Sequence, residues 1–354
     1  MADRSLLVVN YRSARLTADA IASARETSLK PLEVVVVDNS CDPGEAAQLR
    51  SLPIDELVIA SSNTGYSGGI NMGVKHCSGD LVILSNPDIL FRPGAIDRLC
   101  ASVEGGAAMA GPKFVWDEAG NWILPPASAP TLAGKIREIA SVYSSTVVRR
   151  RDRALITQRV RFWSLDQPSA VSFLSGAVMC IRTADVLRFG GFDESFQLYF
   201  EEIDFMNRIR RSGRRLEYVP AAICRHLYNQ SAGISAESAQ KYQASELRYL
   251  EKWSGATAVR VLAHTGKQRA ERSAIAEMDP TEAIELREPL DNLVVEASPL
   301  ATFESAAGLF PRETRIFIPE EILATFRQAE LYVRVVRRDN CETLHSWVIR
   351  KVFK

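Results

Sequence analysis

The sequence lacks a paired-cysteine motif, a long apolar run and an excess of charge of either sign. Its six cysteines show no CxxC spacing and no His-rich partner segment, which argues against a zinc site and against a disulfide framework. The 43 basic residues balance the 43 acidic ones, so the chain as a whole provides no field that attracts polyanions. We therefore expect no nucleic-acid partner.

The apolar segments are all short. The N-terminus, MADRSLLVVNYRS, returns to polar residues too soon for a signal peptide, and no later run has the length of a membrane span. The sequence therefore predicts a cytoplasmic protein with reduced thiols.

Residues 149–161 contain six arginines against one aspartate. This stretch is typical of a solvated face, and the alternative is a basic patch for a phosphate-bearing acceptor or for the inner face of the cell membrane.

The sequence does contain a regular alternation of apolar runs and helical patterns. Residues 5–10 and 33–38 are β-branched runs that stop at a polar residue, which is typical of strands buried on both faces of a parallel sheet. Residues 15–27 between them have helical spacing, so the three segments form a βαβ unit. A second round follows, with helices predicted near 43–52 and 67–77 and strands at 57–60 and 80–84.

Residues 1–90 thus predict a doubly wound α/β domain, with a mostly parallel sheet and helices on both faces. In such sheets, ligands bind beyond the carboxyl ends of the strands. The polar residues at those ends are Asn10, Asp38-Asn39-Ser40 and Ser85-Asn86-Pro87-Asp88. We expect all three clusters to open onto one crevice.

Regular structure is expected again from residue 169. A turn at Ser175-Gly176 separates two apolar runs, and helices are predicted over 183–188 and 201–211. Residues 215–226 form an extended segment that ends at His226.

The remaining parts of the chain are less regular or change character. Residues 120–168 carry Pro125, Pro126 and Pro130 and are expected to be irregular, whereas a helix near 235–253 closes the domain. Beyond it, period-2 alternation predicts a small, mostly β module. We therefore divide the chain into a domain over 1–260 and an appended module over 261–354, whose role the sequence does not define.

The tripeptide Asn86-Pro87-Asp88 directly follows a predicted buried strand. The proline cannot continue a central ladder, so the strand ends and Asp88 turns outward. A carboxylate there could hold Mg²⁺ or Mn²⁺, hard ions that prefer oxygen ligands and bridge phosphates. Taken alone, the tripeptide favours a simple turn.

Two other segments could contact a ligand. Asp38-Asn39-Ser40 could read a base and a ribose, or could only satisfy the backbone of a βα loop. The stretch NTGYSGGINMG, residues 63–73, places four glycines at a helix start, where backbone amides favour phosphate. It is neither a Walker loop nor a GxGxxG motif, and a flexible loop is its alternative interpretation.

Three acids stand together at a predicted helix start, in Glu201-Glu202-Ile203-Asp204. Favourable placement near the helix dipole explains acids at this position. They also follow the aromatic-rich run 196–200, and apolar surroundings raise the pKa of a carboxyl group, which suits a general base. Asp204 and Arg208 are spaced for an i,i+4 ion pair. His226 by itself is typical of a core histidine, and its place at a strand end indicates a metal ligand as the alternative.

In this order, the segments resemble glycosyltransferase family 2, and especially its rhamnosyltransferase-like bacterial branch. The resemblance covers roughly residues 5–255, in the stretches VVNY, VVVDNS, NTGYSGGINMG, LSNPD, LSGAVMCI, GGFDESFQLYFEEIDFMNRIRRSG and YVPAAICRH. It implies a GT-A fold and inverting transfer of a sugar from a nucleotide diphosphate donor.

The resemblance also implies a role for each matching residue. The donor site would contain Asn10, Tyr11, Asp38, Asn39, Asn63, Gly65, Asn71, Asn86 and Gly176. Asp88 and His226 would hold Mg²⁺ or Mn²⁺, and Asn86 stands where the family's Asp-x-Asp motif has a carboxylate. The family's Glu-Asp pair appears here as Glu201-Glu202. Glu202 is therefore the expected base, with Glu201 and Asp204 as neighbouring candidates.

The implied reaction is transfer of L-rhamnose from dTDP-rhamnose to a saccharide or lipid-linked saccharide in bacterial surface polysaccharide synthesis. Two alternatives stay open: a sugar nucleotidyltransferase, and a non-catalytic carbohydrate- or partner-binding protein on a decayed glycosyltransferase fold. The nucleotidyltransferase would need a basic, glycine-rich triphosphate loop, and VVNYRSARLT has no glycine. The oligomeric state is left open.

Overall fold

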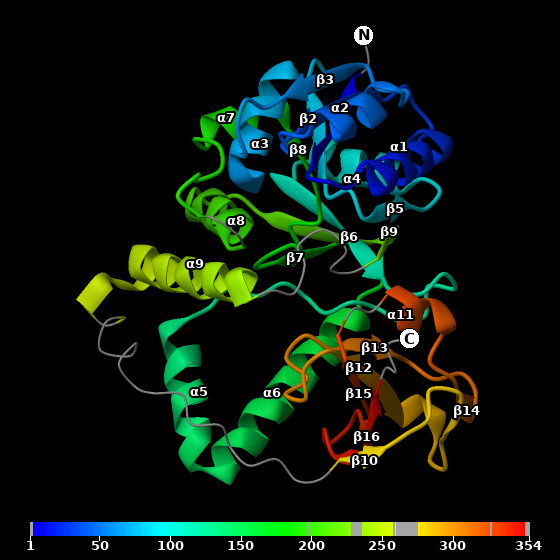
Figure 1. Ribbon diagram of the computed structural model, residues 1–354. Helices are drawn as coiled ribbons and strands as arrows, with labels where there is room; N and C mark the ends of the chain where they lie inside the picture. Colours follow the sequence, from blue (N-terminus) through cyan, green and yellow to red (C-terminus); the bar gives the residue numbers. More distant parts are fainter. Residues whose placement is uncertain are drawn as a thin grey trace. The chain divides into compact units, whose positions relative to one another are not determined.

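A computed structural model describes residues 3–196, 199–227, 236–257, 259, 275–325 and 328–350 (Figure 1). The chain forms two compact units. The first contains residues 1–114, 127–129 and 166–249, and the second contains residues 115–126, 130–165 and 250–354. Within the described residues, no helix is both long enough and apolar enough to cross a membrane.

The first unit is built on a nine-stranded mixed sheet. Eight strands follow the order β3-β2-β1-β4-β8-β6-β9-β5, and β7 pairs with β9 at the side. The strands are β1 (Arg4–Asn10), β2 (Glu33–Asp38), β3 (Glu56–Ile59), β4 (Leu81–Ser85), β5 (Ile89–Phe91), β6 (Met109–Val115), β7 (Ser169–Val171), β8 (Val178–Arg182) and β9 (Leu216–His226).

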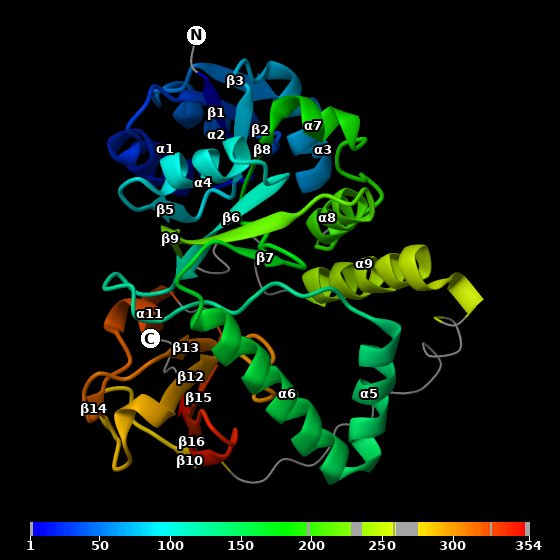
Figure 2. The ribbon, with the colours of Figure 1, turned by 180° about the vertical axis from the view of Figure 1, so that it is seen from behind.

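Helices cover both faces of this sheet, as predicted. Figures 1 and 2 show α1 and α4 on one side and α3 and α7 on the other. The helical elements are α1 (Ala14–Thr27), α2 (Pro43–Arg50), α3 (Gly65–Gly73), the 3₁₀ turn η1 (Val74–His76), α4 (Ala95–Glu104), α7 (Thr183–Arg188), α8 (Glu201–Arg211) and α9 (Ala236–Ser254). The predicted start of the last helix, residue 235, lies outside the described residues.

The centre of the sheet explains why three polar clusters share one edge. β1 pairs in parallel with β2 and with β4, and the apolar residues of the three strands are buried. The register places Asn10 opposite Asp38 and Val8 opposite Ser85. Because parallel strands end at the same edge of a sheet, the clusters that follow β1, β2 and β4 lie along that edge.

Parallel pairing stops at β4, because the next strand in space, β8, runs antiparallel to it. Ser85, at the end of β4, lies opposite Val178, at the start of β8. The chain therefore enters β8 from the carboxyl edge of β4. This reversal brings the turn at Ser175-Gly176 next to the tripeptide Asn86-Pro87-Asp88.

The second unit combines two helices with two small sheets. The helices are α5 (Leu132–Tyr143) and α6 (Ser145–Trp163), and a short α11 (Glu320–Thr325) lies nearer the C-terminus. The five-stranded sheet has the order β10-β16-β15-β12-β13, and β11 pairs with β14. Their bounds are β10 (Ala276–Glu277), β11 (Ile284–Glu285), β12 (Leu293–Ser298), β13 (Ala307–Leu309), β14 (Arg315–Ile316), β15 (Glu330–Arg337) and β16 (Thr343–Arg350). The predicted mostly β module is confirmed.

The irregular structure expected over residues 120–168 is wrong for much of that stretch. Thr131 and Ser144 cap α5 and α6 by accepting from backbone amides of the first turn. Arg159 of α6 donates to Glu296 of β12, and both side chains are buried. This helix therefore belongs to the same compact unit as the C-terminal sheet, and the units do not follow the sequence division at residue 260.

Candidate active site

Asn10 and Asp38 lie side by side at the carboxyl edge of the sheet, and both are fully buried. The side-chain nitrogen of Asn10 donates to Glu45 at 2.9 Å and to Asp38 Oδ1 at 3.4 Å, and its oxygen accepts from Thr17. Asp38 Oδ1 also accepts from the amide of Ser40. Asp38 Oδ2 is buried and has no hydrogen-bond partner among the described residues. Asn10 thus links β1 to α1 and α2. The second carboxylate oxygen of Asp38 is left to accept a hydrogen bond from a ligand.

Asn39 holds the glycine-rich segment at this edge. Its oxygen accepts from the Thr64 amide at 2.9 Å, and its nitrogen donates to the Gly65 carbonyl at 2.8 Å. Asn63 Oδ1 accepts from the Gly65 amide in the turn that begins α3. Gly65 has φ +70°, a conformation that glycine adopts without strain. The structure therefore brings Asn39, Asn63 and Gly65 together. Tyr11, another predicted donor-binding residue, directly follows β1 and is 43% exposed.

Two residues at the start of α3, Tyr66 and Ser67, were not among the predicted site residues. The Tyr66 hydroxyl lies 3.4 Å from the Gly176 carbonyl oxygen. Burial and the nearby carboxyl groups of Glu201 and Glu202 raise the pKa of Tyr66. The Ser67 hydroxyl is buried with no hydrogen-bond partner among the described residues. Tyr66 and Ser67 stand between Gly65 and Gly68 in the glycine-rich segment, and this position is the sequence signal that could have identified them.

The turn at residues 175–177 connects the tripeptide Asn86-Pro87-Asp88 to the expected base. The Asn86 amide donates to the Ala177 carbonyl at 2.9 Å. On the other side of the turn, a β-carbon at Gly176 would lie 2.6 Å from Cγ of Glu202. Since such a contact is too short for two carbons, glycine is the residue that lets Glu202 approach this turn.

Glu201 and Glu202 are the first residues of α8, and one carboxylate oxygen of each is buried with no hydrogen-bond partner among the described residues. Burial and the neighbouring Glu202 raise the pKa of Glu201 well above its usual range, and burial also raises the pKa of Glu202. The two preceding residues, Tyr199 and Phe200, have φ of +65° and +69°. Such backbone strain in non-glycine residues clusters at functional sites.

Asp88 and His226 meet at the other side of the tripeptide. Ile89 of β5 pairs with His226 of β9, and this pairing brings His226 Nε2 to 3.4 Å from Asp88 Oδ2. Asp88 is 1% exposed, and the His226 ring packs against Phe114 at 5.7 Å between ring centroids. The structure therefore brings together the two predicted metal ligands.

The donor set of Asp88 and His226 is suited to a divalent ion that also contacts a substrate. Among the described residues, no group of three or more His, Cys, Asp or Glu side chains could hold a metal ion. Two protein donors are nevertheless enough where phosphate oxygens complete the coordination, as is usual for Mg²⁺. The residues present therefore fit an ion bound together with a nucleoside diphosphate.

Asn71 and Asp204 both hold the segment that precedes α8. Asn71 donates to the Phe192 carbonyl and to Glu194, each at 2.9 Å, and accepts from the Phe192 amide at 2.8 Å. Asp204 is fully buried and forms the predicted i,i+4 pair with Arg208, at 3.1 Å. The side-chain amide of Asn71, a predicted donor-binding residue, is thus bonded to the segment before α8, and the carboxylate of Asp204 is paired with Arg208.

Comparisons with known proteins identify the family of the chain. Residues 2–248 match the model of a family described as "Glycosyltransferase like family 2". An N-acetylglucosaminyl-diphospho-decaprenol L-rhamnosyltransferase of Mycobacterium tuberculosis is 28% identical over 227 residues, 60% of this chain and 72% of the relative. A low-salt glycan biosynthesis hexosyltransferase of Haloferax volcanii is 27% identical over 214 residues, 59% of this chain and 62% of the relative.

Among solved structures, a mannosyltransferase from Pyrobaculum calidifontis, in complex with GDP-Man and Mn²⁺, matches with a TM-score of 0.44 and 15% identity. That match covers 75% of this chain and 76% of the mannosyltransferase. Since the family model matches most of the chain, the protein belongs to the glycosyltransferase family 2-like family. The first unit has the α/β architecture that the sequence predicts, with helices on both faces, whereas its sheet is mixed and not mostly parallel.

Proposed function

We propose that this protein transfers L-rhamnose from dTDP-rhamnose, with inversion, to a saccharide or lipid-linked saccharide in bacterial surface polysaccharide synthesis. The observation that carries the transfer chemistry is the approach of Glu202 to Gly176, on the turn that also binds the Asn86 amide. The choice of rhamnose is supported by the mycobacterial relative at 28% identity. We assign catalysis to residues 1–260.

Glu202 is the general base of the proposed reaction. Its ionised carboxylate accepts the proton of an acceptor hydroxyl while that oxygen attacks the anomeric carbon and the bond to the nucleoside diphosphate breaks. Burial raises the pKa of Glu202, and a base with a raised pKa retains the transferred proton better. The Tyr66 hydroxyl lies beside this turn, 3.4 Å from the Gly176 carbonyl oxygen, and the two glutamates contribute to its raised pKa.

The donor would lie along the edge formed by β1, β2 and the glycine-rich segment. Asp38 Oδ2 is a buried acceptor for an N–H or O–H group of the nucleoside. Asn39, Asn63 and Gly65 fix the start of α3, where backbone amides favour the diphosphate. Asp88 and His226 would hold Mg²⁺ or Mn²⁺. Such an ion, when bound, neutralises the charge that develops on the departing diphosphate.

We also propose peripheral contact with a membrane, which would present a lipid-linked acceptor. The surface is the hairpin of α5 and α6, whose helices meet at Ser144 (Figure 2). Near that junction, Tyr143 is 75% and Val148 44% exposed. Arg149, Arg150 and Arg153 of α6 are exposed beside them. Aromatic and apolar groups with neighbouring arginines are suited to an anionic lipid surface.

A transfer assay tests the proposed activity. Purified protein, dTDP-rhamnose, Mg²⁺ or Mn²⁺ and an N-acetylglucosaminyl-diphospho-lipid should yield a rhamnosylated lipid, detected by mass spectrometry. Glu202→Gln should lose transfer and keep dTDP-rhamnose affinity, because the amide cannot accept the proton. Near-wild-type transfer by this variant would move the base elsewhere. Failure of every nucleotide-sugar donor to be consumed would favour the non-catalytic alternative.

A further inference from the structure

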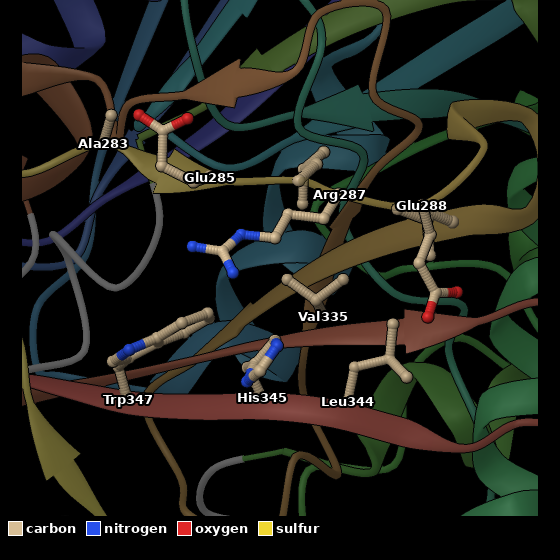
Figure 3. Close-up of a pocket in the computed structure, with 10 residues that line it drawn as sticks. Ala283, Glu285, Arg287, Glu288, Val335, Leu344, His345 and Trp347 are labelled. Carbon is tan, nitrogen blue, oxygen red and sulfur yellow. The ribbon is translucent and has the colours of Figure 1, made fainter.

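A cavity of about 650 Å³ lies in the C-terminal module (Figure 3). None of the residues that line it was predicted as a site residue. Its volume is in the range of small-molecule sites. The sheet supplies one wall, with Leu293 of β12, Val335 of β15 and His345 and Trp347 of β16. The register pairs Val335 with His345, and His345 and Trp347 are two residues apart, so they share one face.

A β-bulge shapes this wall. Val335 pairs with His345, whereas the next residue, Val336, pairs with Thr343, so Leu344 is an extra residue in β16. The bulge allows Leu344 and His345, neighbours in sequence, to line the same cavity. Bulges are often found where a strand has to direct a side chain toward a site.

The segment that includes β11 supplies the opposite wall and its charges. Two carboxylates of the lining are already neutralised: Glu285 pairs with Arg315 at 2.8 Å, and Glu288 accepts from Arg337 Nε at 2.7 Å. The bond from Arg337 lowers the pKa of Glu288, so this carboxylate stays ionised. Arg287 lies between them in sequence, is exposed, and forms no ion pair with any described residue.

The positive charge of Arg287 is therefore not compensated by any described residue, and it faces the cavity. Figure 3 shows its guanidinium group extending into the space above Trp347 and His345. The rings of these two residues lie 5.6 Å apart at an angle of 33° and form an aromatic surface below it. A planar guanidinium group binds a carboxylate or phosphate oxygen through two parallel hydrogen bonds.

We propose that this cavity binds an acidic saccharide, with the anionic group on Arg287 and a sugar ring on Trp347. The C–H face of a pyranose packs on an aromatic ring, and Leu293 and Val335 add apolar surface beside it. Glu285 and Glu288 accept hydrogen bonds from hydroxyl groups. Because these two carboxylates are paired with Arg315 and Arg337, Arg287 leaves the lining with one positive charge that no described residue compensates, which matches a sugar with a single negative charge.

Binding of two matched sugars to the full chain tests the proposal. The probes are methyl β-D-glucuronide and methyl β-D-glucoside, which differ by a carboxylate against a hydroxymethyl group. Titration is followed by the tryptophan indole N–H signals, with Trp347 assigned from Trp347→Phe. The glucuronide should shift the Trp347 signal and bind at least ~10-fold more tightly than the glucoside, the usual value of one charge-assisted hydrogen bond.

Two variants separate the cavity from general charge effects. Arg287→Gln should weaken glucuronide binding ~10-fold and bring it to the level of the glucoside. Arg312→Gln is the matched control, because Arg312 is an exposed arginine of the same module that does not line the cavity. Equal loss in both variants overturns the proposal, as does equal affinity for the two sugars. Tighter binding of dTMP than of the glucuronide at Trp347 overturns the saccharide assignment. None of these results depends on sugar transfer.

Discussion

Gly176 and Glu202 are packed so closely that a β-carbon on the glycine would lie 2.6 Å from Cγ of the glutamate and 3.1 Å from its Cδ. The glycine therefore determines where the carboxylate of Glu202 can stand. Gly176 lies on a turn that is fixed to Asn86 through the Ala177 carbonyl. The position of the proposed base is thus linked by two contacts to the tripeptide Asn86-Pro87-Asp88.

Gly176→Ala should reduce transfer while leaving the donor site intact. The added methyl group must displace Glu202, because the opposing atoms belong to its Cβ, Cγ and Cδ. Misplacement of a catalytic group by an ångström reduces turnover ~100-fold. We expect kcat to fall by this order, with dTDP-rhamnose affinity changed less than about threefold, because the atoms nearest to the added methyl group belong to Glu202 and not to Asp38 or the glycine-rich segment. Steady-state kinetics and a donor titration check this; a normal kcat would show that Glu202 does not act from this position.

The pH dependence of transfer should reflect the burial of Glu202. A base acts in its ionised form, and burial raises the pKa of Glu202, so the acidic limb of kcat/KM should lie above the ordinary glutamate pKa of about 4.3. Glu202 raises the pKa of Glu201, whereas the raised pKa of Glu202 comes from its own burial. Glu201→Gln should therefore leave the limb close to its wild-type position.

The stability of the folded protein should fall with rising pH in the same range in which transfer activity rises. A carboxyl group whose folded-state pKa is raised favours the folded protein below its unfolded pKa, and this contribution is lost as the pH rises through the folded pKa. The Tm of the wild-type protein should thus fall more steeply over that window than the Tm of Glu201→Gln. Thermal unfolding between pH 4 and pH 8 measures this, and parallel curves for both proteins would contradict it.

The strands and helices that build the catalytic edge could be predicted from the sequence. Residues 5–10 and 33–38 were predicted as strands, and the structure has β1 over Arg4–Asn10 and β2 over Glu33–Asp38. The reason is physical: a central parallel strand buries both faces, so its β-branched run is uninterrupted and ends at the polar edge. The helix over residues 183–188 was predicted with the same bounds that the structure has.

Two features depend on distant partners and were missed. In α6, Ile156, Arg159 and Trp163 share the buried face, so an arginine occupies a core position and breaks the apolar pattern. Its charge is compensated by Glu296, far along the chain, and local sequence does not show that. Tyr66 gains its place beside Glu201 and Glu202 only through the folded contact with Gly176.

Asp88→Ala should weaken metal-dependent binding of the nucleoside diphosphate. Asp88 and His226 are the two protein donors brought together at this point, so removal of the carboxylate leaves one. Loss of one ligand of a site with few protein donors should lower dTDP affinity ~10-fold or more in the presence of Mg²⁺. Without metal, the two proteins should bind dTDP alike. Calorimetry with and without Mg²⁺ checks both statements, and unchanged affinity in Mg²⁺ would remove Asp88 from the metal site.

Asp204→Ala should destabilise the protein and leave the chemistry of each folded molecule largely intact. Asp204 is fully buried and pairs with Arg208, which also donates to the Gly191 carbonyl at 2.6 Å. Because Arg208 is 24% exposed, removing the buried carboxylate should cost about 2 kcal/mol, less than in a fully buried pair. Denaturant unfolding should show this loss, while kcat at 15 °C per folded molecule stays within about threefold of wild type. A fall of kcat comparable with that of Glu202→Gln would make Asp204 the base.

The arginines near the α5–α6 junction should govern binding to anionic membranes. A basic side chain near an anionic surface contributes about 1 kcal/mol, so replacing Arg149, Arg150 and Arg153 together by glutamine should weaken binding to phosphatidylglycerol vesicles ~100-fold. The Tyr143→Ser variant should weaken it further by removing an exposed aromatic ring.

A second triple variant provides the matched control for this surface. Arg15→Gln, Arg50→Gln and Arg312→Gln together remove the same charge from exposed positions outside the hairpin. Co-sedimentation with vesicles of phosphatidylglycerol and of phosphatidylcholine measures all the variants. If the hairpin is the membrane surface, the control should bind nearly as wild type does, because charge close to the lipid counts more than net charge at a distance. Equal loss in both triple variants would show that binding follows net charge and would remove the hairpin from the proposed function.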